Sequence, residues 1–75
     1  MSWRLPILKP RDVESILRKL GFHFVEQKGS HAAWEHPDGR FTAVPHHGSE
    51  DIGRGLMRKI LGEIKLSPEE FEKLL

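Results

Sequence analysis

The sequence contains no cysteine. Disulfide bonds and zinc sites built on thiolates are therefore excluded, so the 75 residues must fold around a small apolar core without covalent cross-links. The lack of disulfides fits a reducing compartment, and we expect a cytoplasmic protein.

A long hydrophobic run is also missing. The first ten residues, MSWRLPILKP, hold a short apolar patch that Pro6 interrupts, too short for the apolar part of a signal peptide. No segment approaches the roughly 18 apolar residues of a membrane-spanning helix, so no membrane partner is expected. The net charge of +1 is compatible with a nucleic-acid partner but does not demand one. Repeats and low-complexity linkers are absent, which predicts one domain over residues 1–75.

A first helix is predicted over residues 10–20, PRDVESILRKL. Its apolar side chains recur at i, i+3, i+4 and i+7, which places them on one helical face. Pro10 suits the first position of a helix, and Gly21 suits the left-handed residue just past its end.

Three short strands are predicted next, because the following segments are rich in Phe, Val, Thr and Trp. Turn signals at Gly29-Ser30 and at Pro37-Asp38-Gly39 separate them, and Pro45 ends the third. An antiparallel meander is therefore expected. Its strands are residues 22–28, 31–36 and 40–45.

Helical periodicity returns from about Asp51. Ser67, Pro68 and Glu70 then form a capping-box start for a short C-terminal helix. The apolar stripe of the longer helix consists of Leu56, Met57, Ile60, Leu61 and Ile64.

These elements predict an α+β fold of order αβββα. The small antiparallel sheet has three strands, and the two long helices cover one of its faces in a two-layer sandwich, with a short C-terminal helix added. The same order occurs in double-stranded-RNA-binding domains, although shared topology alone does not fix a function.

All five histidines lie between residues 23 and 47, which raises the question of a metal site. In a strand over 31–36, the side chains of His31 and His36 would point to opposite faces. The adjacent His46 and His47 also diverge, and the thiolate ligands that zinc favours are missing. We therefore expect neither a metal nor another cofactor.

The Gly29-Ser30 turn gives His31 a distinctive neighbourhood. If these two residues form a two-residue hairpin loop, Lys28 lies opposite His31 and Val25 lies opposite Trp34. Trp34 then faces the helices, while His31 faces solvent beside a cation and the turn amides. An exposed imidazole beside a cation and free backbone N–H groups could bind a phosphate ester and act on it. The alternative, which spacing alone favours, is a solvated strand histidine without a function.

Other conspicuous side chains have structural interpretations. Trp34 and Phe41 are expected in the core. Arg54, Arg58 and Lys59 are expected to form a solvated helix face, with phosphate contact as the less favoured alternative.

Five sequence pieces occur in one order: LP at 5–6 before the helix ending at Gly21-Phe22, QKGSH with Trp34 after it, HPDGR, VPHH, and GLMRKIL running into LSPEEF. This ordered set, which spans Leu5 to Phe71, resembles the HicA family of toxin ribonucleases from bacterial toxin–antitoxin modules.

The resemblance implies a small αβββα domain like a double-stranded-RNA-binding fold, and cleavage of mRNA that requires the histidine of the Gly-Ser-His turn. It also implies a HicB-type antitoxin that covers this surface. His31 is the matching histidine, Gly29 and Ser30 match the turn, and His47 matches the second histidine of the valine-proline motif. The chain departs from the family pattern at Glu26, where an arginine is often found, and at the second helix, which lacks the usual terminal glycine.

With the resemblance, the sequence predicts a toxin-type endoribonuclease that uses metal-independent acid–base catalysis. His31 would be the general base, Lys28 and the amides of Gly29 and Ser30 would bind the phosphate, and His47 would join the substrate site, where it or water would act as the general acid. Two rival interpretations are a non-catalytic RNA-binding module and a protein-interaction domain.

Overall fold

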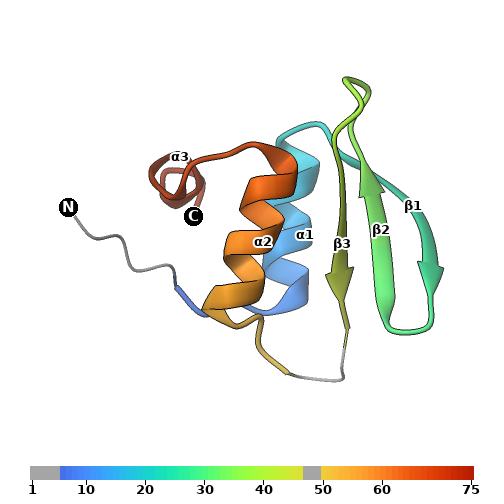
Figure 1. Ribbon diagram of the computed structural model, residues 1–75, viewed down its shortest axis with the longest axis horizontal. Coiled ribbons are helices and arrows are strands. Elements are labelled where there is room, and N and C mark those ends of the chain that lie inside the picture. Colours follow the sequence, from blue (N-terminus) through green and yellow to red (C-terminus); the bar gives the residue numbers. More distant parts are fainter. Residues whose placement is uncertain (1–5, 47–49) are drawn as a thin grey trace.

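The computed structural model describes residues 6–46 and 50–75. Its strands form an antiparallel sheet in the order β1-β2-β3, and α1 and α2 lie on the same side of that sheet (Figure 1). The predicted α+β class and αβββα order are therefore confirmed, and the arrangement fits that of a double-stranded-RNA-binding domain. The elements are α1 (Pro10–Lys19), β1 (His23–Lys28), β2 (His31–Glu35), β3 (Phe41–Pro45), α2 (Arg54–Ile64) and α3 (Pro68–Glu72).

The apolar core lies between the helices and the sheet. It is built from the predicted helical stripes and from the inward-facing strand residues, because burying these side chains supplies the main driving force for folding. Leu56 is only partly buried at its edge. The buried hydrophobic residues are Val13, Ile16, Leu17, Phe22, Ala32, Trp34, Val44, Ile52, Met57, Ile60, Leu61, Ile64 and Phe71.

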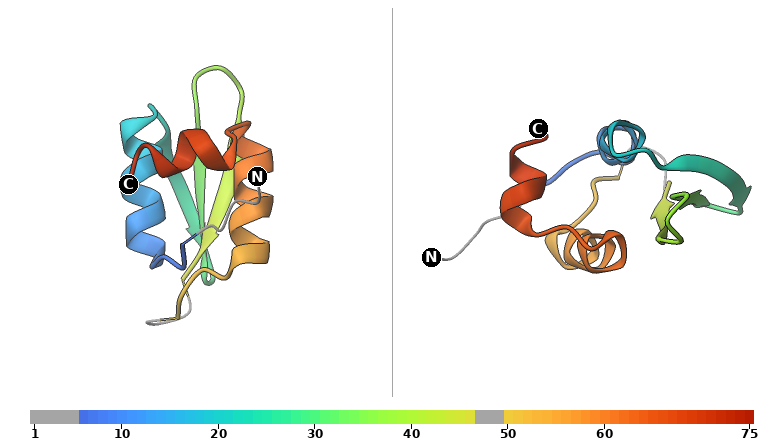
Figure 2. Two further views of the ribbon diagram at one scale, coloured as in Figure 1. Left: turned by 90° about the vertical axis from the view of Figure 1, so that its left-hand side faces the viewer. Right: turned by 90° about the horizontal axis from the view of Figure 1, so that it is seen from above.

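The C-terminal helix α3 lies across α1 and α2 on the side away from the sheet (Figure 2). Its start is the predicted capping box: the Glu70 N–H donates to Ser67 Oγ at 3.1 Å, and the Ser67 N–H donates to Glu70 Oε1 at 3.0 Å. Phe71, which is 1% exposed, then packs into the core. In the part of the chain described here, no helix is long and apolar enough to cross a bilayer.

Strand β1 contains a β-bulge that spacing did not predict. Lys28 lies opposite His31, as expected, but Phe24 rather than Val25 lies opposite Trp34. Val25 is the extra residue of the bulge, which shifts the register by one position. The predicted pairing of Val25 with Trp34 is therefore wrong, and Val25 is 45% exposed. The Phe24 ring instead packs edge-on against the Trp34 ring, with 5.9 Å between the ring centroids.

Phe41 was predicted in the core and is instead 50% exposed. The reason is the alternation of β3, whose buried Thr42 and Val44 point toward the helices. Phe41 therefore points to the other face of the sheet, away from the core.

The second long helix begins at Arg54, later than the predicted Asp51. Ile52 is extended instead, because it forms an isolated antiparallel bridge with Leu8 and donates its N–H to the Leu8 carbonyl at 2.7 Å. Beside the bridge, Lys9 Nζ lies 2.7 Å from Asp51 Oδ1.

Candidate functional site

His31 lies at the start of β2, the central strand of the sheet. Its antiparallel partners are Lys28 on β1 and Pro45 on β3. Gly29 has a φ of 58°, whereas Ser30 does not have a positive φ. This combination is that of a type II′ turn, which favours glycine at its first central position. The two-residue hairpin loop predicted from the sequence is therefore confirmed.

The turn presents His31 on the sheet face opposite α1 and α2. Ala32 and Trp34 are buried against the helices, and His31 is exposed, as the sequence predicted. The backbone N–H of His46 donates to the Ser30 carbonyl, so the segment after β3 holds the turn in place. His47, the remaining predicted site residue, lies outside the described residues.

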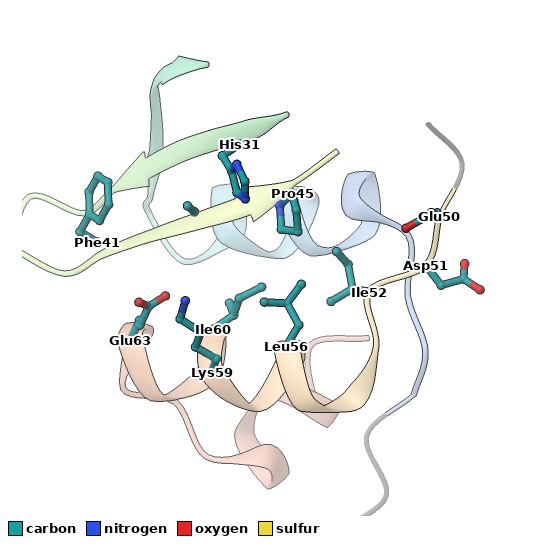
Figure 3. Close-up of a pocket in the computed structure, with 11 residues that line it drawn as sticks. His31, Phe41, Pro45, Glu50, Asp51, Ile52, Leu56, Lys59, Ile60 and Glu63 are labelled. Carbon is teal, nitrogen blue, oxygen red and sulfur yellow. The ribbon is translucent and has the colours of Figure 1, made fainter. Parts of the chain in front are cut away.

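His31 also lines a pocket of about 300 Å³ at the β3 edge of the sheet, between the outward side chains of β3 and the side chains of α2 (Figure 3). The outward positions of β3 form its sheet side, and the small side chain of Ala43 leaves space there. The α2 side is lined by Leu56, Lys59, Ile60 and Glu63.

Lys59 was predicted on a solvated helix face together with Arg54 and Arg58. The structure places Lys59 at the pocket wall, whereas Arg54 and Arg58 do not line the pocket. Sequence periodicity can assign Lys59 to the polar side of α2, but it cannot tell that this side turns toward β3. Residue spacing alone therefore could not predict that Lys59 lines the same pocket as His31.

Lys28 lies on the other side of His31, toward β1. Its side chain is 81% exposed, and Nζ lies 3.5 Å from Oε2 of Glu26. An exposed pair of this kind is weak, so Lys28 can exchange Glu26 for another anion. Glu26, the residue that departs from the family pattern, thus offsets part of the positive charge beside the turn.

A buried carboxylate in α1 was not anticipated. Glu14 is 9% exposed and accepts a hydrogen bond of 2.9 Å from Trp34 Nε1. Its other oxygen lies 3.0 Å from His46 Nε2, but the ring nitrogen is not aligned for a hydrogen bond. The two atoms are therefore close without forming a hydrogen bond, and they form an ion pair only when His46 is protonated. One feature of the sequence could have indicated this burial: Glu14 lies about one helical turn before Leu17, next to the apolar face of the helix.

His36 has a structural role. Its Nδ1 accepts from the Asp38 N–H at 3.1 Å, so Nε2 carries the proton and donates to the Leu20 carbonyl at 3.1 Å. The Arg40 backbone N–H is the main cause that lowers the pKa of Asp38, helped by the Arg40 side chain. Within residues 6–46 and 50–75, no three His, Asp or Glu side chains gather as metal ligands would.

The chain matches the model of a protein family described as the HicA toxin of bacterial toxin–antitoxin, over residues 10–66. The matched region extends from the first residue of α1 beyond the end of α2. It therefore includes the His31 turn and the residues on both sides of the pocket. No curated protein matches the chain.

Proposed function

The chain belongs to the HicA toxin family of bacterial toxin–antitoxin systems, and on this premise we propose that it is an endoribonuclease that cleaves mRNA with His31 as its general base. The observation that carries the proposal is the position of His31. Its imidazole is exposed at a glycine turn, opposite Lys28, and lines a pocket of about 300 Å³.

The chemistry follows from a neutral imidazole next to a phosphodiester. His31 accepts the proton of a ribose 2′-OH, and the 2′-oxygen attacks the adjacent phosphorus. The bond from phosphorus to the 5′-oxygen breaks, which leaves a 2′,3′-cyclic phosphate on one product and a 5′-hydroxyl on the other. The 5′-oxygen takes up a proton from His47 or from water. No metal is required for these steps.

Negative charge develops on the phosphoryl oxygens during the attack. Lys28 and the backbone N–H groups of Gly29 and Ser30 are the proposed donors to these oxygens. The hydrogen bond from His46 to the Ser30 carbonyl fixes the turn, so these donors need no rearrangement when the charge appears.

A HicB-type antitoxin is the proposed partner. Because inhibition requires that RNA be kept from the histidine, the antitoxin is expected to cover the turn and the mouth of the pocket. In the complex, His31 would be protected from solvent and cleavage would stop.

The proposal is tested by incubating labelled single-stranded RNA with the purified protein in excess EDTA. Wild type and a His23→Ala variant should both cleave it, because His23 is exposed on β1 and does not line the pocket. His31→Ala should lose detectable cleavage while keeping its thermal stability. Cleavage by a folded His31→Ala protein would remove His31 from the chemistry. Intact RNA with wild type, together with a salt-dependent gel shift, would favour the non-catalytic RNA-binding module.

A further inference from the structure

The pocket beside His31 has two chemically different ends. On β3, Phe41 and Pro45 lie four residues apart, about 13 Å along the strand, and Pro45 is the residue opposite His31. Glu63 belongs to the Phe41 end, since it accepts a hydrogen bond of 2.9 Å from Thr42, the neighbour of Phe41. Figure 3 shows the same order, with Phe41 and Glu63 at one end and His31 nearer the other.

Phe41 supplies an aromatic surface at the pocket wall. Its side chain is half exposed, and the next outward position on β3 is the small Ala43, which pairs with the equally small Ala33. Ala43 lines the pocket, and its small side chain leaves room for a flat group beside the Phe41 ring. Exposed aromatic rings of this kind stack on unpaired bases in proteins that bind single-stranded RNA.

Glu63 decides what kind of group fits beside Phe41. An ionised carboxylate only accepts hydrogen bonds, and Thr42 occupies one of its lone-pair positions. The other two carboxylates of the lining, Glu50 and Asp51, lie at the far end of the pocket, beyond Pro45 (Figure 3), and Asp51 is paired with Lys9 at 2.7 Å. At the Phe41 end, the Glu63 carboxylate repels an isolated phosphate but accepts the N–H donors of a base. Among the four RNA bases, guanine alone has two adjacent donor groups on its pairing edge, N1–H and N2–H₂.

Lys59 lies between these two ends. It precedes Glu63 by one helical turn on α2, and among the described residues that line the pocket it is the one lysine or arginine. Figure 3 shows its ammonium group turned toward the sheet. Because Lys28 lies beside His31 on β1, His31 has one lysine toward β1 and another in its pocket.

We propose that the pocket holds a guanine nucleotide of single-stranded RNA next to the cleaved bond. The base stacks on Phe41, its donor edge binds Glu63, and Lys59 contacts the phosphate that joins this nucleotide to the one at His31. This inference rests on the proposed ribonuclease function and adds to it a base subsite, with its specificity-determining residues.

The first test uses uridine-rich oligonucleotides that differ only in a single central guanine, adenine or cytosine. Wild type should cleave the guanine-containing RNA most efficiently. Phe41→Leu should lower kcat/KM by about tenfold or more, whereas Phe41→Trp should retain it. Glu63→Gln can still accept from Thr42 but replaces one acceptor by a donor, so it should lose the guanine preference. Equal cleavage of the three RNAs by wild type and by both Phe41→Leu and Glu63→Gln would overturn the pocket assignment and leave the ribonuclease function intact.

The role of Lys59 is tested by the salt dependence of RNA binding. Lys59→Ala should weaken RNA binding to all three oligonucleotides and reduce the slope of log K against log salt by about one. Arg58→Ala is the matched control, since it removes the same charge from the neighbouring position of α2, outside the pocket. An equal effect of both substitutions would show only a general charge effect and would remove Lys59 from the subsite.

The second test separates the pocket from the catalysis. Binding of the three oligonucleotides to the His31→Ala protein is measured by fluorescence anisotropy, because this RNA stays intact. A guanine preference that Phe41→Leu abolishes supports the subsite even if wild type proves unable to cleave RNA. If RNA binding is unaffected by Phe41→Leu and Glu63→Gln, while a tetra-arginine peptide binds tightly and loses affinity in Glu63→Gln, the pocket receives a cationic side chain of a protein partner and the guanine proposal is wrong.

Discussion

The indole N–H of Trp34 donates a hydrogen bond of 2.9 Å to the buried carboxylate of Glu14. It thereby ties the central strand, on which His31 lies, to α1 within the core. The second oxygen of Glu14 lies 3.0 Å from His46 Nε2, and the backbone N–H of His46 holds the Ser30 carbonyl. One carboxylate thus connects the core to the segment that fixes the turn.

Removal of this carboxylate should destabilise the fold. Glu14→Ala leaves the Trp34 N–H buried without an acceptor, which should lower the free energy of unfolding by about 1–3 kcal/mol. Glu14→Gln keeps a side-chain oxygen that can accept from Trp34, so its free energy of unfolding should fall by less. Urea denaturation measures both, with the exposed Glu35→Ala as a control expected to change stability by less than about 0.5 kcal/mol. Equal losses for Ala and Gln would show that the hydrogen bond to Trp34 contributes little.

Gly29 should be needed for its backbone conformation rather than for space. Its φ is 58°, yet a Cβ built at this position meets nothing within 4 Å. Gly29→Ala should therefore cost about 1–2 kcal/mol of stability through backbone strain, and should lower RNA cleavage further because the turn that presents His31 is displaced. Gly53→Ala, at a position that is also open but lacks a positive φ, is the control. Wild-type stability and cleavage in Gly29→Ala would contradict this role of the turn.

Lys65 ends α2 in the left-handed conformation, with φ 57° and ψ 47°. This is the position where a glycine is usual and where a side chain costs about 1–2 kcal/mol. Lys65→Gly should therefore raise the free energy of unfolding by about 1 kcal/mol. Lys19→Gly, within the right-handed α1, should lower it by about 0.5–1 kcal/mol. A loss of stability in Lys65→Gly would mean that the lysine side chain makes a compensating contact.

The capping box of α3 should make stability depend on acid. The backbone N–H of Ser67 is the main cause that holds the pKa of Glu70 below its ordinary value of 4.5. Because the folded-state pKa is the lower one, this contribution is present above the unfolded pKa and disappears as the pH falls through the folded pKa. Glu70→Gln should thus be less stable than wild type at pH 7, and the difference should shrink toward pH 3. A pH-independent difference in urea unfolding would contradict this assignment.

Local patterns were sufficient to predict much of the fold. The apolar face of α1, the capping box at Ser67 and the pairing of Lys28 with His31 each depend on residues close in sequence. These were confirmed because short-range geometry determines them. The whole αβββα order then followed from the alternation of helical and strand segments.

The errors all concern longer-range packing. The bulge at Val25 depends on how the first strand twists against its neighbour, and a single extra residue changes which side chain meets Trp34. The exposure of Phe41 depends on which face of β3 packs against the helices, since strand alternation allows either. The approach of Lys59 to the pocket depends on where α2 packs beside β3. The contact between Glu14 and Trp34 joins residues 20 positions apart, which no periodicity reveals.

The proposed action of His31 on the ribose 2′-OH is tested most directly at the cleaved bond itself. Wild-type protein is given an RNA with a mapped cleavage position, and the same RNA with a 2′-deoxyribose at that nucleotide, and mass spectrometry identifies the ends of the products. The predicted result is a 2′,3′-cyclic phosphate and a 5′-hydroxyl from the first RNA and no cleavage of the second at that position. Cleavage of the deoxy-substituted RNA there, or a 3′-hydroxyl end, would contradict attack by the 2′-oxygen and the role of His31 as its base.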